Sequence, residues 1–217
     1  MKQLLFIGLS LLFISCNETE NIKEYYYQLE NFDEPKYYVF EYIGNPEGSQ
    51  YWKIKTNKEK KELTTEVFNS KFEKAEFSKE KFDESGAKFI EYSSFSNGRK
   101  TESKINSNNV FLWEPHEEYN YSMTLYEDGI ETEFKKVREY IGKETILVLG
   151  KKTEAIKFKG SYTFDNSFYK EPVKFWQYSY YTKDHAFVKW ERHSPNGEIM
   201  IMELKEILTE NEWNNLK

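Results

Sequence analysis

The side chain with the most distinctive chemistry is the thiol of Cys16, the only cysteine in the chain. A single thiol cannot form an intramolecular disulfide bond, so an intrachain disulfide framework is excluded. Cys16 follows the basic residue Lys2, an apolar run over residues 4–15, and the small residue Ser15 at the end of that run. This order is typical of a cleaved export signal. The apolar run is shorter than the ~20 residues that a membrane-spanning helix needs, so a permanent transmembrane helix is not expected.

The residues Phe13-Ile14-Ser15-Cys16 resemble the lipobox of bacterial lipoproteins, although the usual lipobox has Leu at the position of Phe13. The resemblance implies that residues 1–16 are a lipoprotein signal peptide ending at the acylated Cys16. The alternative is a plain secretory signal that leaves a free thiol in the mature protein. The residue after Cys16 is Asn17 and not Asp, so the commonest inner-membrane retention signal is missing and the outer membrane is favoured.

The stretch after Cys16 is polar and acidic, and we predict a tether over residues 17–34 and a folded domain over residues 35–217. The formal net charge of the chain is −6, which argues against nucleic acid as a partner. The same charge disfavours a peripheral contact with anionic lipid, so the membrane would hold the protein through the acyl chains alone. We expect a monomer.

The three histidines are the other candidates for chemistry. His116 adjoins Glu117 and Glu118, an acidic cluster that could hold a cation, but no second histidine lies at helical or strand spacing. His185 falls in a predicted turn. His193 precedes Ser194, which lacks the flanking glycines of an exposed nucleophile. We therefore expect no catalytic residue, no metal site and no cofactor, and a protein that is not an enzyme.

Aromatic residues are the clearest excess in the composition, at 18% of the chain. The simplest reading of any single aromatic residue is the core of a β domain, but large rings that line a cleft also hold apolar or sugar ligands. The candidate ligand-binding residues are Trp52, Trp113, Trp176, Tyr178, Tyr180 and Trp190.

Turn signals recur at about the 8–12 residue spacing of an antiparallel meander, and Asn97-Gly98 is typical of a tight hairpin. The best-defined strands are predicted over 173–182, 186–193 and 198–208, with Gly160 as a candidate β-bulge in an earlier strand. Residues 173–182 carry aromatic side chains on both faces, so both faces must be covered. A capping box at Thr209–Glu212 predicts a short helix over 209–216. The fold class is mainly β: one large, strongly curled antiparallel sheet, either a half-barrel or an open barrel.

Residues 138–208 resemble a group of uncharacterised exported lipoproteins of Bacteroidetes-like bacteria. The likeness rests on Gly142-Lys143-Glu144-Thr145, on residues 150–157, on Val188-Lys189-Trp190-Glu191 and on Glu203-Leu204-Lys205. Such domains are similar to the half-barrels of the periplasmic lipoprotein-carrier family, which implies a twisted sheet around an apolar cavity. This chain departs from the group at 185–187, where His-Ala-Phe replaces the usual glycine pair.

Two hypotheses follow. The first is a lipid-anchored envelope protein that binds an apolar, lipid-like ligand on the concave side of the sheet. The second is a structural or interaction lipoprotein with a filled core that docks on another envelope protein. An open cavity of several hundred Å³ would favour the first hypothesis, and a filled core would favour the second.

Overall fold

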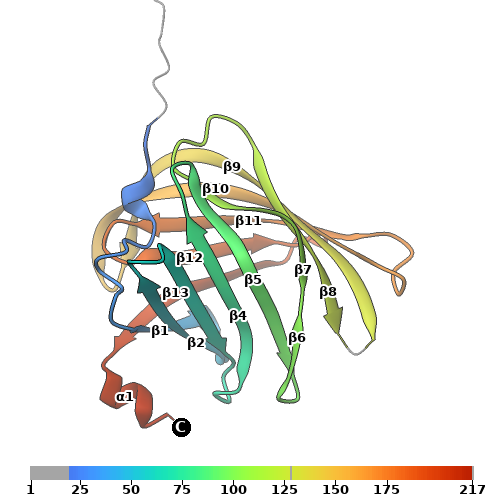
Figure 1. The fold of residues 1–217 in the computed structure, drawn as a ribbon, viewed down its shortest axis with the longest axis horizontal. Coiled ribbons are helices and arrows are strands. Elements are labelled where there is room, and N and C mark those ends of the chain that lie inside the picture. The colour runs from blue at the N-terminus through green and yellow to red at the C-terminus, as the bar shows by residue number, and fades with distance from the viewer. Residues whose placement is uncertain (1–19, 128, 217) are drawn as a thin grey trace, which may run out of the picture.

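The computed structural model describes residues 20–127 and 129–216. The predicted signal peptide, with Cys16, lies outside the described residues. Within them the chain forms a single antiparallel sheet of thirteen strands, one 3-10 turn, η1 (Lys23–Tyr25), and one α-helix, α1 (Glu210–Asn214). Figure 1 shows the sheet curled on itself, with β9–β12 running across the direction of β4–β8.

The strands, in chain order, are β1 (Lys36–Tyr42), β2 (Asn45–Asn57), β3 (Glu62–Phe68), β4 (Lys74–Phe82), β5 (Gly86–Ser96), β6 (Arg99–Glu102), β7 (Lys104–Leu112), β8 (Tyr119–Glu127), β9 (Ile130–Val148), β10 (Lys151–Asn166), β11 (Val173–Thr182), β12 (Ala186–His193) and β13 (Ile199–Leu208).

The sheet is a closed barrel, and not the half-barrel or open barrel that the sequence predicts. Nearly every strand pairs with its neighbours in the chain, as in an up-and-down meander. The first and last strands then pair with each other, β1 with β13, from Tyr37↔Leu208 to Tyr42↔Met202. Twelve strands form the barrel and β6 pairs beside it with the end of β5. Closure removes two exposed sheet edges, which explains why it is favoured once the sheet is curled enough.

Local signals in the sequence place several elements correctly. Asn97 and Gly98 have positive φ angles of 49° and 73°, the conformation of a tight hairpin turn. β11 and β12 have the predicted bounds. At α1, the Thr209 side chain accepts from the Glu212 backbone N–H and the Glu212 side chain accepts from the Thr209 N–H, so the capping box is confirmed. The helix ends earlier than predicted, at Asn214.

The irregularity in β10 is not at Gly160. Gly160 pairs regularly with Arg138 on β9 and with Gln177 on β11. The register shift lies between Lys157 and Phe158, opposite the left-handed Gly142 of β9, whose φ is 132°. A glycine is required there because other residues rarely adopt this backbone conformation.

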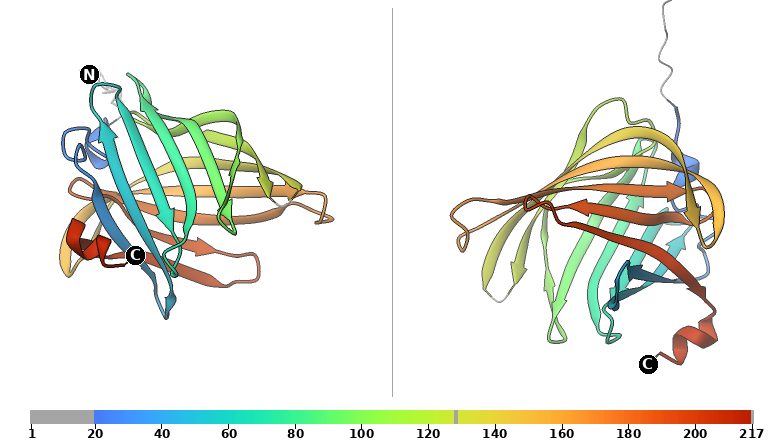
Figure 2. Two further views of the ribbon diagram at one scale, coloured as in Figure 1. Left: turned by 60° about the horizontal axis from the view of Figure 1, so that its bottom comes forward. Right: turned by 180° about the vertical axis from the view of Figure 1, so that it is seen from behind.

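The segment predicted as a polar tether is part of the folded domain over residues 22–32. Five of its apolar or aromatic side chains are buried: Ile22, Tyr25, Tyr26, Tyr27 and Phe32. They pack into the main core cluster, and the backbone of Phe32 accepts a hydrogen bond from Thr56 of β2 (2.6 Å). The segment therefore fills one end of the barrel (Figure 2). Its charged residues face solvent, which is why its composition reads as a linker.

Candidate functional site

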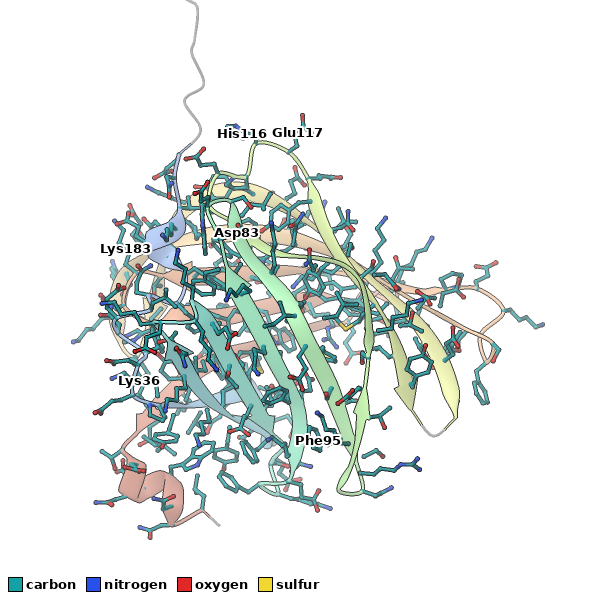
Figure 3. All side chains as sticks on the ribbon, in the orientation of Figure 1. Lys36, Asp83, Phe95, His116, Glu117 and Lys183 are labelled. Carbon is teal, nitrogen blue, oxygen red and sulfur yellow. The ribbon has the colours of Figure 1, made fainter. Side chains whose placement is uncertain are left out.

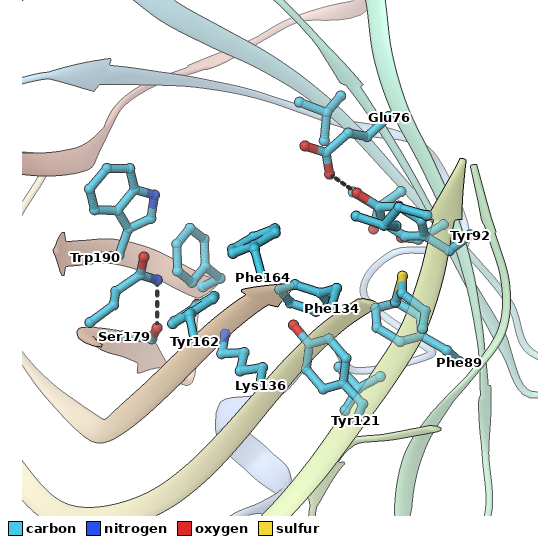
Figure 4. A pocket seen from close by; sticks show the side chains of 18 of the residues that line it. Glu76, Phe89, Tyr92, Tyr121, Phe134, Lys136, Tyr162, Phe164, Ser179 and Trp190 are labelled. Carbon is cyan, nitrogen blue, oxygen red and sulfur yellow. Dashed lines mark hydrogen bonds between the residues drawn. The ribbon is translucent and has the colours of Figure 1, made fainter. Parts of the chain in front are cut away.

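The barrel is filled at the end that holds the N-terminal segment and hollow beyond it. The hollow part is a cavity of about 760 Å³ (Figure 4). Fifteen aromatic residues line it: Tyr26, Tyr27, Tyr42, Trp52, Phe89, Tyr92, Tyr121, Phe134, Tyr162, Phe164, Tyr169, Phe175, Tyr181, Phe187 and Trp190. Tyr169 and Val173 are lining residues that are exposed, so the β10–β11 hairpin forms part of the solvent edge of the cavity.

Strand alternation decides which side chains enter the cavity. On β11 the lining residues are Val173, Phe175, Gln177, Ser179 and Tyr181, which alternate with the other residues along the strand. The Gln177 amide donates to the Ser179 hydroxyl (3.2 Å), and Figure 4 shows this bond at the wall of the cavity. The wall is therefore mixed, with aromatic rings and polar groups on the same strand.

Two of the six predicted ligand-binding residues line the cavity. Trp52 and Trp190 both face it, and the Trp52 indole is stacked on Phe187, with ring centroids 5.3 Å apart. Trp113 lies in the filled end of the barrel, where it packs on Tyr26, and its indole N–H donates to the backbone oxygen of Asp83 (2.9 Å). Trp113 is thus a core residue.

The other three predicted residues lie on the outer face of β11 and do not line the cavity. Trp176, Tyr178 and Tyr180 alternate with the inward-facing residues, so the pleat directs them outward. They are covered there by lysine side chains: Lys157 Nζ lies 4.0 Å from the Tyr178 ring centroid and Lys189 Nζ lies 5.8 Å from that of Tyr180. The aliphatic stem of a lysine can cover an aromatic ring while its amine stays in water. Both faces of β11 are therefore covered, as the sequence predicts. Side chains of the same sheet cover the outer face, without a second layer of secondary structure.

A cluster of three cationic side chains was not found by sequence reasoning. Lys136, Arg138 and Arg192 come from β9 and β12, and the side chains of Lys136 and Arg192 line the cavity. Lys136 is 7% exposed and Arg138 is 1% exposed. Among the described residues, no carboxylate forms an ion pair with any of the three. The alternation of β9 places Lys136 and Arg138 on its inner face, but a lysine or arginine on a strand is ordinarily taken as solvent-exposed.

Arg138 is held by aromatic rings and two hydrogen bonds. One terminal nitrogen donates to the Val110 backbone oxygen (2.6 Å) and the other donates to the Tyr181 hydroxyl (3.1 Å). Its guanidinium carbon lies 4.3 Å from the centroid of Phe158, with Phe111 also within reach. These contacts replace part of the hydration that the guanidinium group loses on burial.

Glu80 of β4 links the barrel wall to the N-terminal segment. Its carboxyl group is buried and accepts a hydrogen bond from the Tyr26 hydroxyl (2.7 Å). Burial raises the pKa of Glu80 from 4.5 to about 7, while the Tyr26 hydrogen bond and the charge of Arg138 act in the opposite direction. Glu80 therefore changes its protonation state near neutral pH.

This raised pKa predicts a pH-dependent effect of Glu80→Gln. The folded protein keeps a proton that the unfolded chain releases between about pH 4.5 and about pH 7, so ionisation destabilises the fold as the pH rises through this window. At about 1.4 kcal/mol per pKa unit, the penalty on the wild type reaches roughly 3 kcal/mol above pH 7. The advantage of the Gln variant over the wild type should grow by this amount between about pH 5 and about pH 8, measured by urea unfolding. A difference that is independent of pH would contradict the assignment.

The histidines are not assembled into a site. His116 lies beside Glu117 at the connection between β7 and β8 (Figure 3). His193 stacks on Trp176 with ring centroids 3.7 Å apart, and its Nε2 lies 2.6 Å from a carboxylate oxygen of Glu191. Ser194 lies in the turn after β12, where its backbone oxygen accepts from Gly197. Over residues 20–127 and 129–216 no three His, Cys, Asp or Glu side chains group as metal ligands would. No helix in this part of the chain is long and apolar enough to cross a membrane.

Two crystal structures share this fold. The first is described as a "putative lipoprotein" from Parabacteroides distasonis; it is 14% identical, with a TM-score of 0.56 over 81% of this chain and 95% of that one. The second is described as a "putative exported protein with YmcC-like fold" from Bacteroides fragilis; it is 12% identical, with a TM-score of 0.52 over 82% of this chain and 100% of that one. No protein-family model and no curated protein matches the chain. At these identities the likeness establishes the fold.

Proposed function

We propose that this protein is an exported lipoprotein of the cell envelope that binds an apolar or amphipathic small molecule inside its barrel, without catalysing a reaction. The observation that carries the proposal is the cavity of about 760 Å³ between the filled end of the barrel and the β10–β11 hairpin. Sites for small organic molecules are typically about 300–1,000 Å³ and are lined mainly by apolar and aromatic side chains with a few polar groups. The cavity has a volume in this range, and aromatic and aliphatic residues make up most of its lining, beside polar ones such as Gln177 and Ser179.

The alternative role, an interaction lipoprotein with a filled core, is supported less well. Only one end of the barrel is filled, by the core cluster around Tyr26, Phe111 and Phe158. Beyond it the side chains of Trp52, Phe134 and Trp190 surround open space. A barrel that served only as a rigid platform would gain dispersion energy by filling this space, so the hollow favours a ligand.

The lipid anchor is supported by the residues around Cys16 and by the fold. The lipobox-like Phe13-Ile14-Ser15-Cys16 places the thiol at the predicted cleavage point. The two proteins that share the fold are described as a lipoprotein and as an exported protein, which agrees with export of this chain. We propose the outer membrane as its location because Asn17, and not Asp, follows the cysteine.

Cys16→Ser tests the anchor. A serine hydroxyl cannot replace the thiol as the acylated group, so the variant should lose all of its acyl mass and its partition into detergent. The measurement is the intact mass of the purified protein together with detergent phase separation of cell extracts. Asn17→Ser is the matched control, because it changes the adjacent residue and keeps the thiol. A Cys16→Ser protein with the acylated mass of the wild type would rule out the anchor.

Native mass spectrometry tests the cavity. The protein should be produced in a compartment where lipids are present, purified with mild detergent, and compared before and after organic extraction. A co-purifying small molecule at near one-to-one occupancy supports a binding role. A clean ligand-free mass, with no rise in Tm from a panel of lipids, would refute the binding role and favour the interaction protein.

A further inference from the structure

The cations in the cavity form a site, and their arrangement follows from the strand register. Tyr162 of β10 and Phe175 of β11 are opposite each other and their rings are stacked, with centroids 4.6 Å apart. Lys136 Nζ lies 4.7 Å from the centroid of Tyr162, and the Arg192 guanidinium carbon lies 4.4 Å from that of Phe175. The two cations therefore rest on two adjacent, stacked rings at the wall of the cavity.

The backbone at Gly160 leaves space for the side chain of Lys136. Gly160 lies next to Lys136, and a Cβ at Gly160 would come within 3.0 Å of Lys136 Cε. Any other residue at position 160 would therefore press on the stem of the lysine. Figure 4 shows Lys136 among Tyr121, Tyr162 and Phe134, directed into the cavity from β9. The absence of a side chain at Gly160 thus leaves room for the lysine stem against the sheet.

In the part of the chain that the structure describes, Lys136 and Arg192 lack the carboxylate partners that buried cationic side chains normally have. Among the described residues neither Lys136 nor Arg192 forms an ion pair, and Arg192 Nε is buried without a hydrogen-bond partner. The two carboxylates that line the cavity are engaged elsewhere: Glu80 accepts from Tyr26, and Glu76 accepts from the Tyr92 hydroxyl (2.9 Å). A buried cation without a partner is costly, and an anionic ligand would remove that cost.

We infer that the ligand is an amphiphile with an anionic head, a carboxylate or phosphate, that binds to Lys136 and Arg192 while its hydrocarbon tail occupies the aromatic part of the cavity. This inference rests on the proposed binding function and assigns the chemical class of the ligand. Phe89, Met123 and Phe134 line the same cavity and supply the apolar surface for the tail. Burial, followed by the charges of Arg138 and Arg192, lowers the pKa of the Lys136 amine well below its ordinary value. A bound anion would oppose this and favour the charged amine.

Matched amphiphiles test the inference. Dodecanoate and dodecanol have the same chain, and only the first carries a charge; acetate tests the head without the chain. Binding is measured by titration of tryptophan fluorescence, because Trp52 and Trp190 line the cavity. A charge-assisted hydrogen bond in a buried site corresponds to about a tenfold to hundredfold difference in affinity. Dodecanoate should bind tighter than dodecanol by this factor, and acetate should not bind measurably.

Lys136→Met is the decisive variant, because methionine keeps the length of the stem and removes the amine. It should weaken dodecanoate binding by about tenfold, because Arg192 alone remains to bind the head, and it should change dodecanol binding much less. The variant should fold, because removing an unpaired buried amine is often neutral or stabilising. Lys135→Met is the control: Lys135 is the exposed neighbour on β9 and faces away from the cavity.

The outcomes separate the inference from the proposed function. Equal affinities of the wild type for dodecanoate and dodecanol would overturn the inference that the ligand has an anionic head. The proposal that the cavity binds an apolar molecule would still stand. A dodecanoate affinity that Lys136→Met leaves unchanged would overturn the assignment to Lys136. If acetate bound as tightly as dodecanoate, the site would be one for small free anions. This result would overturn the inference that the ligand is an amphiphile. Failure of both amphiphiles to bind would overturn the proposed function as well.

Discussion

A chain from which residues 22–33 have been deleted is expected to lose its native fold. This segment contributes five buried side chains to the core: Ile22, Tyr25, Tyr26, Tyr27 and Phe32. At about 1.5–3 kcal/mol for each fully buried large apolar side chain, their loss costs on the order of 10 kcal/mol. This is comparable with the whole stability of an ordinary domain, about 5–15 kcal/mol, so little native structure should remain at room temperature.

The deletion also leaves polar groups of the barrel without partners. The Thr56 side chain donates to the Leu29 backbone oxygen (2.7 Å), and the Trp113 backbone oxygen accepts from Ile22 (2.8 Å). The Glu80 carboxyl group loses its hydrogen bond from Tyr26. Each buried group left unsatisfied adds about 1–3 kcal/mol to the cost, so the loss exceeds the apolar term alone.

Near-ultraviolet circular dichroism and a thermal melt measure this loss. The deleted chain should show no fixed aromatic signal and no cooperative transition. Glu30→Ala is the control within the same segment: Glu30 is exposed and pairs at the surface with Lys58, 3.5 Å away, so the change should stay within about 0.5 kcal/mol. A deleted chain that melts cooperatively near the wild-type Tm would show that the segment is a dispensable tether after all.

Phe158→Ala is expected to destabilise the protein by about 3–5 kcal/mol, the usual cost of truncating a buried phenylalanine. Phe158 of β10 is 0% exposed, and its ring centroid lies 5.3 Å from that of Phe111 and 5.5 Å from that of Tyr140. It is also the ring nearest to the buried guanidinium group of Arg138. Removing the ring leaves a cavity and exposes part of an unpaired charge, which places the cost toward the upper end of this range.

Urea unfolding measures the cost as a fall in the transition midpoint at constant m-value. In a thermal melt the same change should lower the Tm by on the order of 10 °C for a domain of this size. Phe168→Ala is the matched control, because Phe168 is the same residue type in the β10–β11 connection and is 71% exposed. A similar loss in both variants would show that Phe158 does not hold the core together.

The two stability predictions concern the filled end of the barrel, and Lys136→Met concerns the hollow end. The filled end is stabilised by aromatic rings that pack around Phe111 and Phe158. At the hollow end Lys136 and Arg192 rest on a stacked pair of rings, Tyr162 and Phe175.

The sequence by itself determined the features that depend on neighbouring residues. Asn97-Gly98 specifies a hairpin because both residues tolerate positive φ, and Thr209 with Glu212 specifies a helix start because the two side chains satisfy each other's backbone N–H groups. The nearly continuous aromatic residues of β11 likewise predict a strand with rings on both faces. In each case the interacting groups are a few residues apart, so a short stretch of sequence contains all the partners.

Only the tertiary structure decided which face of that strand is the inside. Trp176 and Tyr181 have equally suitable side chains for a cavity, but the curvature of the whole sheet turns Tyr181 inward and Trp176 outward. The closure of β1 on β13, the burial of Tyr26, and the presence of Lys136 and Arg192 in one cavity depend on the same curvature. These groups are far apart along the chain. The energy that brings them together comes from surface buried by the complete barrel, which no local pattern of residues contains.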